Sequence, residues 1–241
     1  MSEQLVTRAE LPAATRAQMF DLYCSQFENA SREQFDADLD GKNWVLLLRD
    51  DEDKLVGFSN MHVYKARINS RDTWFVYSGD TTVDSSTWND PTLAYSLMGA
   101  FRFFQRHYDC DVLYWFLIVS GYRTYRVLPV FSDMFYPRFD KPTPDDIRAL
   151  MTHIAVERFG DQYDPGSGIV RLDAPSILRN GYRGIPENRL GDPNIAFFAE
   201  RNPGHPDGDA MVCICELSER TFTKLGKRMW RKGRDLFPPA K

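Results

Sequence analysis

An uninterrupted apolar run behind an amphipathic helix limits the possible folds more than any other feature of this chain. Residues 111–121 read DVLYWFLIVSG, which has the length of a strand but no polar alternation, as in strands buried on both faces of a sheet. A parallel neighbour for such a strand requires a crossover connection. Residues 91–108 supply one, because large apolar side chains recur there at helical spacing: Leu93, Leu97, Phe101, Phe104 and Tyr108. We therefore predict a right-handed crossover unit: a strand over 73–84, this helix, and a strand over 112–119.

The segments on either side of this unit predict the rest of a single α/β domain covering residues 1–241. Residues 11–27 have the spacing of an amphipathic helix. Residues 44–84 contain three apolar or β-branched runs separated by the polar clusters DDED and NSRD, so we expect an antiparallel meander there. Farther along we expect a capped helix over 142–160, a loop-rich insertion over 161–194, a hairpin of IAFFAE and AMVCICE, and a basic helix and tail over 217–241.

Composition limits the classes of function. The chain has 241 residues, of which 43% are hydrophobic and 14% aromatic, enough to bury a large core. A net charge of -4 argues against nucleic acid as a partner of the whole chain. The N-terminus lacks a signal pattern, and no apolar run has the length of a membrane span. We expect a cytoplasmic protein without a transmembrane segment or a metal site, in which Cys213 and Cys215 are buried small residues.

The predicted element order and the segment VDSSTWNDPTLAYSL over residues 83–97 resemble the GNAT acyltransferase superfamily. The resemblance implies an α/β fold: a GNAT-like mixed sheet with an antiparallel N-terminal meander, a parallel crossover pair and a C-terminal hairpin, flanked by helices. It also implies an N-acyltransferase that moves an acyl group from a thioester donor to a small-molecule amine. The donor would be acyl-CoA or an acyl-phosphopantetheine carried by an acidic acyl carrier protein.

Two other functions remain open at this point. One is a non-catalytic GNAT-like binding module, which would have no cleft at the predicted site. The other is a hydrolase of small substrates, which would need Ser120 or a cysteine within hydrogen-bond reach of a base.

The chain departs from the superfamily pattern where coenzyme A would bind. In the superfamily, an Arg or Gln and glycines at a helix N-terminus hold the pyrophosphate, and these positions fall here on Trp88, Pro91 and Leu93. Pro91 has no N–H to donate, and Asp90 adds negative charge. We therefore expect the pantetheine arm of the donor to matter more than the nucleotide.

Gly79 interrupts the strand over 73–84. A glycine inside a strand predicts either a bulge that only shapes the sheet or a point where a ligand approaches the backbone. In the superfamily two strands separate at this place and the pantetheine amide binds in the gap. The resemblance therefore implies donor contacts with the backbone of Gly79, Thr82, Val83 and Asp84.

Asp80 is the candidate general base. Strict strand alternation would give it apolar neighbours on one face of the sheet, and burial there would raise its pKa. The neighbours on that face would be Trp74, Val76, Ser78 and Thr82. The alternative is a structural Asp that accepts backbone hydrogen bonds at the bulge.

Tyrosines and arginines complete the candidate site. The superfamily often presents a tyrosine to the thioester sulfur after the second strand of the parallel pair, which implies Tyr122 or Tyr125 as the acid; aromatic packing is the alternative for both. Arg102, Arg106 and Arg123 lie near the predicted donor site in the sequence and would suit a phosphopantetheine or an acidic carrier protein. A solvated surface is the alternative for the arginines.

Overall fold

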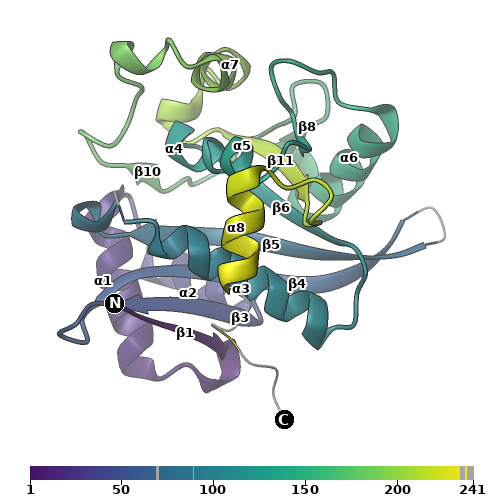
Figure 1. Ribbon diagram of the computed structural model, residues 1–241. Helices are drawn as coiled ribbons and strands as arrows, with labels where there is room; N and C mark the ends of the chain where they lie inside the picture. Colours follow the sequence, from purple (N-terminus) through teal and green to yellow (C-terminus); the bar gives the residue numbers. More distant parts are fainter. Residues whose placement is uncertain (69–70, 89, 234–236, 238–241) are drawn as a thin grey trace.

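The computed structural model describes residues 1–68, 71–88, 90–233 and 237. Its main sheet has the order β1-β3-β4-β5-β6-β11-β9-β8, with β7 paired to β11 (Figure 1). A separate two-stranded sheet joins β10 to β2. The strands are β1 (Ser2–Thr7), β2 (Phe27–Glu28), β3 (Trp44–Arg49), β4 (Leu55–Ile68), β5 (Arg71–Val83), β6 (Leu113–Val119), β7 (Phe135–Tyr136), β8 (Tyr163–Asp164), β9 (Ile169–Val170), β10 (Ile177–Leu178) and β11 (Ala210–Glu216).

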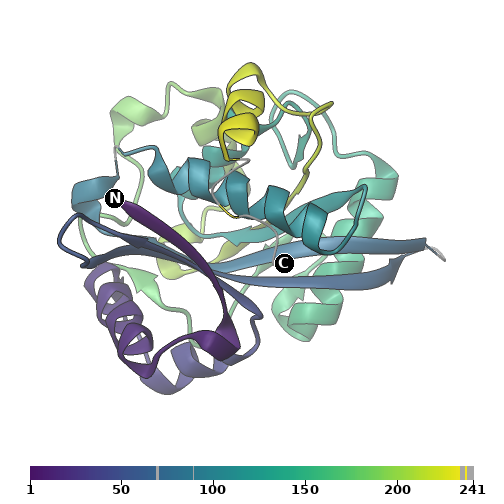
Figure 2. The ribbon, with the colours of Figure 1, turned by 60° about the horizontal axis from the view of Figure 1, so that its bottom comes forward.

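Helices cover both faces of the main sheet. They are α1 (Ala13–Gln26), α2 (Arg32–Asp40), α3 (Thr92–His107), α4 (Tyr122–Tyr125), α5 (Val127–Phe131), α6 (Asp145–Phe159), α7 (Pro193–Arg201) and α8 (Lys224–Lys232). Figure 2 shows α1 and α2 on one side of the sheet and α3 and α8 on the other. The side chains divide accordingly into a large core under α3 and α8, and smaller cores under α1–α2 and under α6.

The pairing of the strands confirms the predicted meander and crossover unit. Strands β3, β4 and β5 are successive antiparallel neighbours, and β5 pairs with β6 in parallel after the crossover through α3. The chain thus has the mixed α/β sheet with flanking helices that was expected. Cys213 and Cys215 lie in β11 and are buried in the core under α3 and α8.

The predicted C-terminal hairpin is wrong in its first strand. The segment IAFFAE lies in α7, which begins after Asp192. The Asp192 side chain accepts a hydrogen bond from the N–H of Asn194, and Pro193 lies in the first turn of the helix. Such a start favours a helix, and Ile195 and Phe198 are buried at helical spacing. The AMVCICE strand, β11, pairs instead with β6, antiparallel.

Two elements near the N-terminus were not predicted. Strand β1 pairs antiparallel with β3 and extends the meander by one strand. Helix α2 begins after Ser31, whose hydroxyl accepts a hydrogen bond from the N–H of Gln34.

The predicted loop-rich insertion and the predicted basic helix both contain regular structure. The predicted insertion over 161–194 contains the short strands β8, β9 and β10. The predicted basic helix over 217–241 corresponds to α8, and its residues 234–236 and 238–241 lie outside the described part of the chain. Among the described residues, no helix has the length and apolar character required to cross a membrane.

Candidate functional site

The parallel pair β5–β6 opens at its carboxyl end. Pairing runs from Trp74 opposite Leu113 to Ser78 opposite Leu117, whereas β5 itself continues to Val83. Gly79 and Asp80 follow directly, and both lie opposite Asn60 of β4, because the register shifts there by one residue. The bulge predicted at Gly79 is therefore present, and it coincides with the point where β5 and β6 separate.

The bulge moves Asp80 to the face opposite the one predicted. Ser78 pairs with Met61, which belongs to the core under α3, whereas Thr82 pairs with Phe58, which belongs to the core under α1 and α2. An unbroken strand would keep residues 78 and 82 on one face, but one extra residue reverses the alternation. The expectation that Asp80 and Thr82 share a face with Trp74, Val76 and Ser78 is thus wrong.

On the α2 face, Asp80 meets two charged groups that the sequence analysis missed. These are Asp38 and Lys42, and both act on its ionisation. The Lys42 ammonium Nζ lies 2.6 Å from Oδ2 of Asp38 and 3.1 Å from its carbonyl oxygen. Only 2% of the Lys42 side chain is exposed, so this is a nearly buried cation held at the end of a helix.

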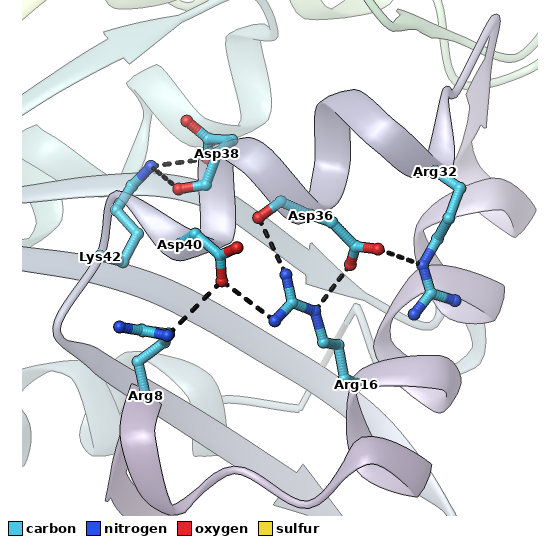
Figure 3. A network of polar contacts seen from close by, with 7 residues as sticks. All are labelled: Arg8, Arg16, Arg32, Asp36, Asp38, Asp40 and Lys42. Carbon is cyan, nitrogen blue, oxygen red and sulfur yellow. Dashed lines mark hydrogen bonds and ion pairs between the residues drawn. The ribbon is translucent and has the colours of Figure 1, made fainter.

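A network of ion pairs fixes α2 in place (Figure 3). Arg16 of α1 pairs with Asp36 at 2.7 Å and with Asp40 at 3.0 Å. Asp36 also pairs with Arg32 at 2.7 Å. Asp36 and Asp40 are one turn apart and therefore share a face of α2. Asp38 lies outside that face, and Figure 3 shows it paired with Lys42 instead. The network thus holds the helix so that Asp38 is positioned toward the bulge.

The end of the Lys42 side chain lies close to Gly79. A Cβ at residue 79 would lie 2.9 Å from Cε and 3.1 Å from Nζ of Lys42. The Lys42 ammonium also lies 5.2 Å from the ring centre of Tyr77, a cation–π distance. The side chain of Lys42 therefore passes over the strand where a larger residue at position 79 would block it.

Burial and the neighbouring Asp38 carboxylate raise the pKa of Asp80 to about 7, and the Lys42 ammonium opposes the rise. Like charge and desolvation both disfavour the ionised form of a carboxyl group. The direction of this shift agrees with the prediction for a base, although a neighbouring carboxylate as well as burial produces it.

Two buried polar side chains, Asn60 and Thr82, lie beside Asp80. Asn60 is completely buried, and its side chain acts on Asp80 as a hydrogen-bond donor that lowers the pKa of that carboxyl group. The hydroxyl of Thr82 is buried without a hydrogen-bond partner among the described residues. Buried polar groups are nearly always hydrogen-bonded, so this hydroxyl can bind a ligand or water.

The backbone groups predicted to contact the donor do not all face the gap. The N–H of Asp84 donates to the carbonyl of Val56 in β4 at 2.8 Å. Because backbone groups alternate along a strand, Thr82 also turns its N–H and carbonyl to β4. Those of Val83 turn toward β6, and the Val83 carbonyl accepts a hydrogen bond from the indole N–H of Trp88 at 3.1 Å.

Tyr122 and Tyr125 share the short helix α4, but both are buried in the core under α3. The Tyr125 hydroxyl donates to the carbonyl of Pro137 at 2.9 Å, and burial raises its pKa. Its ring stacks on Phe198 at 5.6 Å. These contacts support the packing alternative for Tyr125, and the burial of Tyr122 points the same way.

Of the three predicted arginines, Arg123 contacts residues at the open end of the parallel pair. Arg102 donates to the carbonyl of Trp230 at 3.4 Å, and Arg106 donates to that of Phe237 at 3.1 Å. Both therefore contact α8 and the segment after it. Their closeness to the donor site in the sequence reflects the length of α3, which runs away from that end.

A strap, defined as residues 177–183, lies at the open end near Arg123. Arg123 donates to the carbonyl of Tyr182 at 3.2 Å and lies 4.5 Å from the ring centre of Trp88. The Trp88 and Tyr182 rings are 4.8 Å apart. Leu178, in β10, lies 3.6 Å from the position of a Cβ on Gly121, just after β6. The strap thus contacts residues that follow β5 and β6 in the chain.

The N-terminus of α3 is already capped. Oδ1 of Asp90 accepts hydrogen bonds from the N–H of Thr92 at 2.8 Å and from its hydroxyl, and these bonds lower the pKa of Asp90. An ionised carboxylate thus occupies the position where a helix N-terminus would bind phosphate.

Two cavities lie elsewhere on the molecule. One, of about 460 Å³, is lined by Phe159, Asp161, Gln162, Asp164, Arg171 and Asp173. The other, of about 550 Å³, is lined by Lys224, Lys227, Arg228, Arg231 and Lys232. Asp80 lines neither of them. No group of three or more His, Cys, Asp or Glu side chains in the described ranges is arranged to hold a metal ion.

Comparison with known proteins finds similarity in structure only. No family model matches the sequence, and no curated protein matches it either. A conserved protein of unknown function from Enterococcus faecalis V583, named "Probable N-Acyltransferase", is 14% identical with a TM-score of 0.40. That match covers 56% of this chain and 33% of the other, so this chain spans one third of that protein.

Two further similar structures are named as N-acetyltransferases. The GNAT-family N-acetyltransferase YhbS from Escherichia coli, in complex with CoA, is 17% identical with a TM-score of 0.35, over 48% of this chain and 62% of that one. An aminoglycoside 6'-N-acetyltransferase from Acinetobacter baumannii is 9% identical with a TM-score of 0.37, over 46% and 77%.

Proposed function

We propose that this chain is an N-acyltransferase that moves an acyl group from a thioester to an amine, with Asp80 as general base. One observation carries the proposal: a carboxylate with a raised pKa stands where the two parallel strands separate. A strongly perturbed carboxylate with specific charged neighbours is a frequent mark of a functional site.

The proposed step uses few protein groups. The amine nitrogen attacks the carbonyl carbon of the thioester while Asp80 takes the proton that the nitrogen loses. The carbon–sulfur bond breaks, and its electron pair leaves with sulfur as a thiolate, which takes a proton from water. Because thiols have a pKa of about 8.5, the thiolate can leave without a protein acid, and the buried Tyr122 and Tyr125 are not needed for that role.

For the donor, we propose an acyl-CoA or an acyl-phosphopantetheine bound mainly through its pantetheine arm. The N–H of Val83 turns toward β6 and would bind the arm, since the Val83 carbonyl already accepts a hydrogen bond from Trp88, and Gly79 at the bulge would leave room. A carrier-bound donor is the second candidate, and the Asp90 cap on α3 favours it, because that carboxylate would repel a pyrophosphate.

The hydrolase alternative has less support. Burial raises the pKa of the Cys213 thiol and raises that of Cys110 to about 11, which disfavours the reactive thiolate. A nucleophilic hydrolase needs the opposite shift or an adjacent base.

The test is single-turnover acyl transfer with Asp80→Asn, a variant that keeps the shape of the side chain and removes the base. We expect a loss of about a hundredfold or more in rate, the scale of one acid–base group, with donor affinity close to that of the parent. Asp72→Asn on the same strand is the matched control, because Asp72 is exposed and pairs with Lys65 at 3.0 Å. An Asp80→Asn variant that is less stable but reacts at the parental rate would refute the assignment of the base.

A further inference from the structure

A second charged group lies on the same face of the sheet as Asp80, at Arg158 near the end of α6. The Arg158 guanidinium lies 4.1 Å from the ring centre of Tyr77 and 5.3 Å from that of Tyr64. Its Nη2 is 2.9 Å from Nδ1 of His62. Tyr77 is thus contacted by Lys42 and by Arg158, and its hydroxyl lies in the field of Asp38, Asp80 and Arg158.

Arg158 has unused donors. Its Nε is buried without a hydrogen-bond partner among the described residues. A guanidinium has five N–H donors arranged to bind a carboxylate or phosphate. The acceptor that Nη2 does have, Nδ1 of His62, belongs to a side chain whose pKa is lowered to about 4 and which is therefore neutral at pH 7, so an anion could still bind to Arg158.

The neighbouring His62 does not supply that anion. Burial and the charges of Arg158 and Lys42 lower its pKa to about 4, so His62 is neutral at pH 7 and its Nδ1 accepts the bond from Arg158. The Arg158 guanidinium is thus a cation at one end of this face. At the other end Asp38 pairs with the Lys42 ammonium, and Asp80 lies in the field of both groups.

We propose that the acceptor is a small amine that also carries an anionic group, with its nitrogen at Asp38 and Asp80 and its anion, a carboxylate or a phosphate, at Arg158. This inference rests on the proposed function and specifies the class of its acceptor. The two ends of the site match the two charges of such a molecule: a carboxylate pair attracts the amine, and a guanidinium attracts the anion. The ring of Tyr77 is contacted by Lys42 and by Arg158, and its hydroxyl lies in the field of Asp38, Asp80 and Arg158.

The experiment compares four probes on the full chain. β-Alanine and phosphoethanolamine carry an amine with a carboxylate or a phosphate, propylamine lacks the anion, and propionate lacks the amine. We expect a KM for at least one of the two zwitterions about tenfold or more below that of propylamine, the scale of a charge-assisted pair. Which of them binds better identifies the anion.

The variant Arg158→Gln tests the residue. We expect it to raise the KM for the preferred zwitterion about tenfold more than the KM for propylamine, and Arg158→Lys should restore part of the difference. The matched control is Arg148→Gln on the same helix, because the Arg148 side chain is exposed and pairs only with Asp145 among the described residues. Thermal unfolding of each variant shows whether the fold is retained.

Calorimetric binding of the same probes without donor separates this inference from the proposed function. Transfer to propylamine and to both zwitterions with equal KM would overturn the acceptor class and leave acyl transfer in place. Binding of a zwitterion that depends on Arg158, without transfer to any amine, would support the acceptor site and overturn the proposed reaction. Failure of both zwitterions to bind or react would overturn the inference.

Discussion

The buried ammonium of Lys42 lies 2.6 Å from Oδ2 of Asp38 and 3.1 Å from the position that a Cβ on residue 79 would take. Both groups also act on Asp80, with opposite sign. Burial raises the pKa of Asp80 most, and these two neighbours, from α2 and the turn after it, then shift the pKa in opposite directions.

The first prediction concerns the pH dependence of the rate. Asp80 has a pKa raised to about 7, and the proposed reaction uses its ionised form as the base, so the single-turnover rate should increase with pH and level off above 7. A rate that is already at its plateau at pH 5 would contradict the role of Asp80. The Asp80→Asn variant should lack the increase.

The second prediction uses the two neighbours of Asp80 as opposite perturbations. Asp38→Asn removes a like charge and should lower the pKa of Asp80, so the midpoint of the pH–rate profile should move to lower pH. Lys42→Gln removes the opposing cation and should move it to higher pH. Only the midpoint of the profile is compared, because either change can also lower the maximal rate. Midpoints that shift in the same direction for both variants would contradict the opposite effects of Asp38 and Lys42 on the pKa of Asp80.

The third prediction concerns stability. The folded pKa of Asp80 is raised, so between about pH 4, its ordinary range, and pH 7 the folded state holds a proton that the unfolded state has lost. This group therefore makes the free energy of unfolding fall as pH rises through that window. Urea unfolding should show Asp80→Asn gaining stability relative to the parent from pH 4 to pH 7.

The control for stability is a carboxyl group whose pKa is shifted in the opposite direction. Hydrogen bonding to Lys65 lowers the pKa of Asp72, so the difference between Asp72→Asn and the parent should be flat above pH 5. A flat difference for Asp80→Asn as well would mean that the folded state does not perturb Asp80.

The sequence predicted the crossover unit because its signals are long and agree with each other. Five large apolar residues at helical spacing precede a run of strand length, and the parallel pairing of β5 with β6 follows from their order. The segment IAFFAE was misread because short apolar runs fit either a strand or a helix. The Asp192–Pro193 start was the signal that could have decided for the helix.

The site itself was only partly predictable. Gly79 and Asp80 were identified from the strand pattern, but the face on which Asp80 lies depends on a bulge of one residue, which reverses the alternation. Asp38 and Lys42 were missed because α2, REQFDADLD, is short and strongly acidic and has few apolar residues to reveal its period. Arg158 could not be assigned because its neighbours His62 and Tyr77 are distant in the sequence.

The fourth prediction concerns the donor. Since Asp90 caps α3 and Pro91 offers no N–H, coenzyme A and its pantetheine fragment should bind with affinities within about tenfold of each other. Calorimetry with both compounds measures this difference. A coenzyme A affinity that exceeds that of pantetheine by several hundredfold would show that the nucleotide is held and would contradict the account of the α3 N-terminus.

The last prediction tests the contact between Gly79 and Lys42. In Gly79→Ala the new methyl group would lie 2.9 Å from Cε and 3.1 Å from Nζ of Lys42, closer than such atoms can approach, so the ammonium must move. Because Lys42 opposes the rise in the pKa of Asp80, its displacement should move the pH–rate midpoint to higher pH. Overpacking of this kind also costs about 1–3 kcal/mol in the free energy of unfolding. Gly191→Ala is the matched control, because no atom among the described residues lies within 4 Å of its Cβ position, and it should change neither quantity. If Lys42→Gln moves the midpoint but Gly79→Ala leaves it at the parental value, then the position of the buried ammonium does not depend on the absence of a side chain at residue 79.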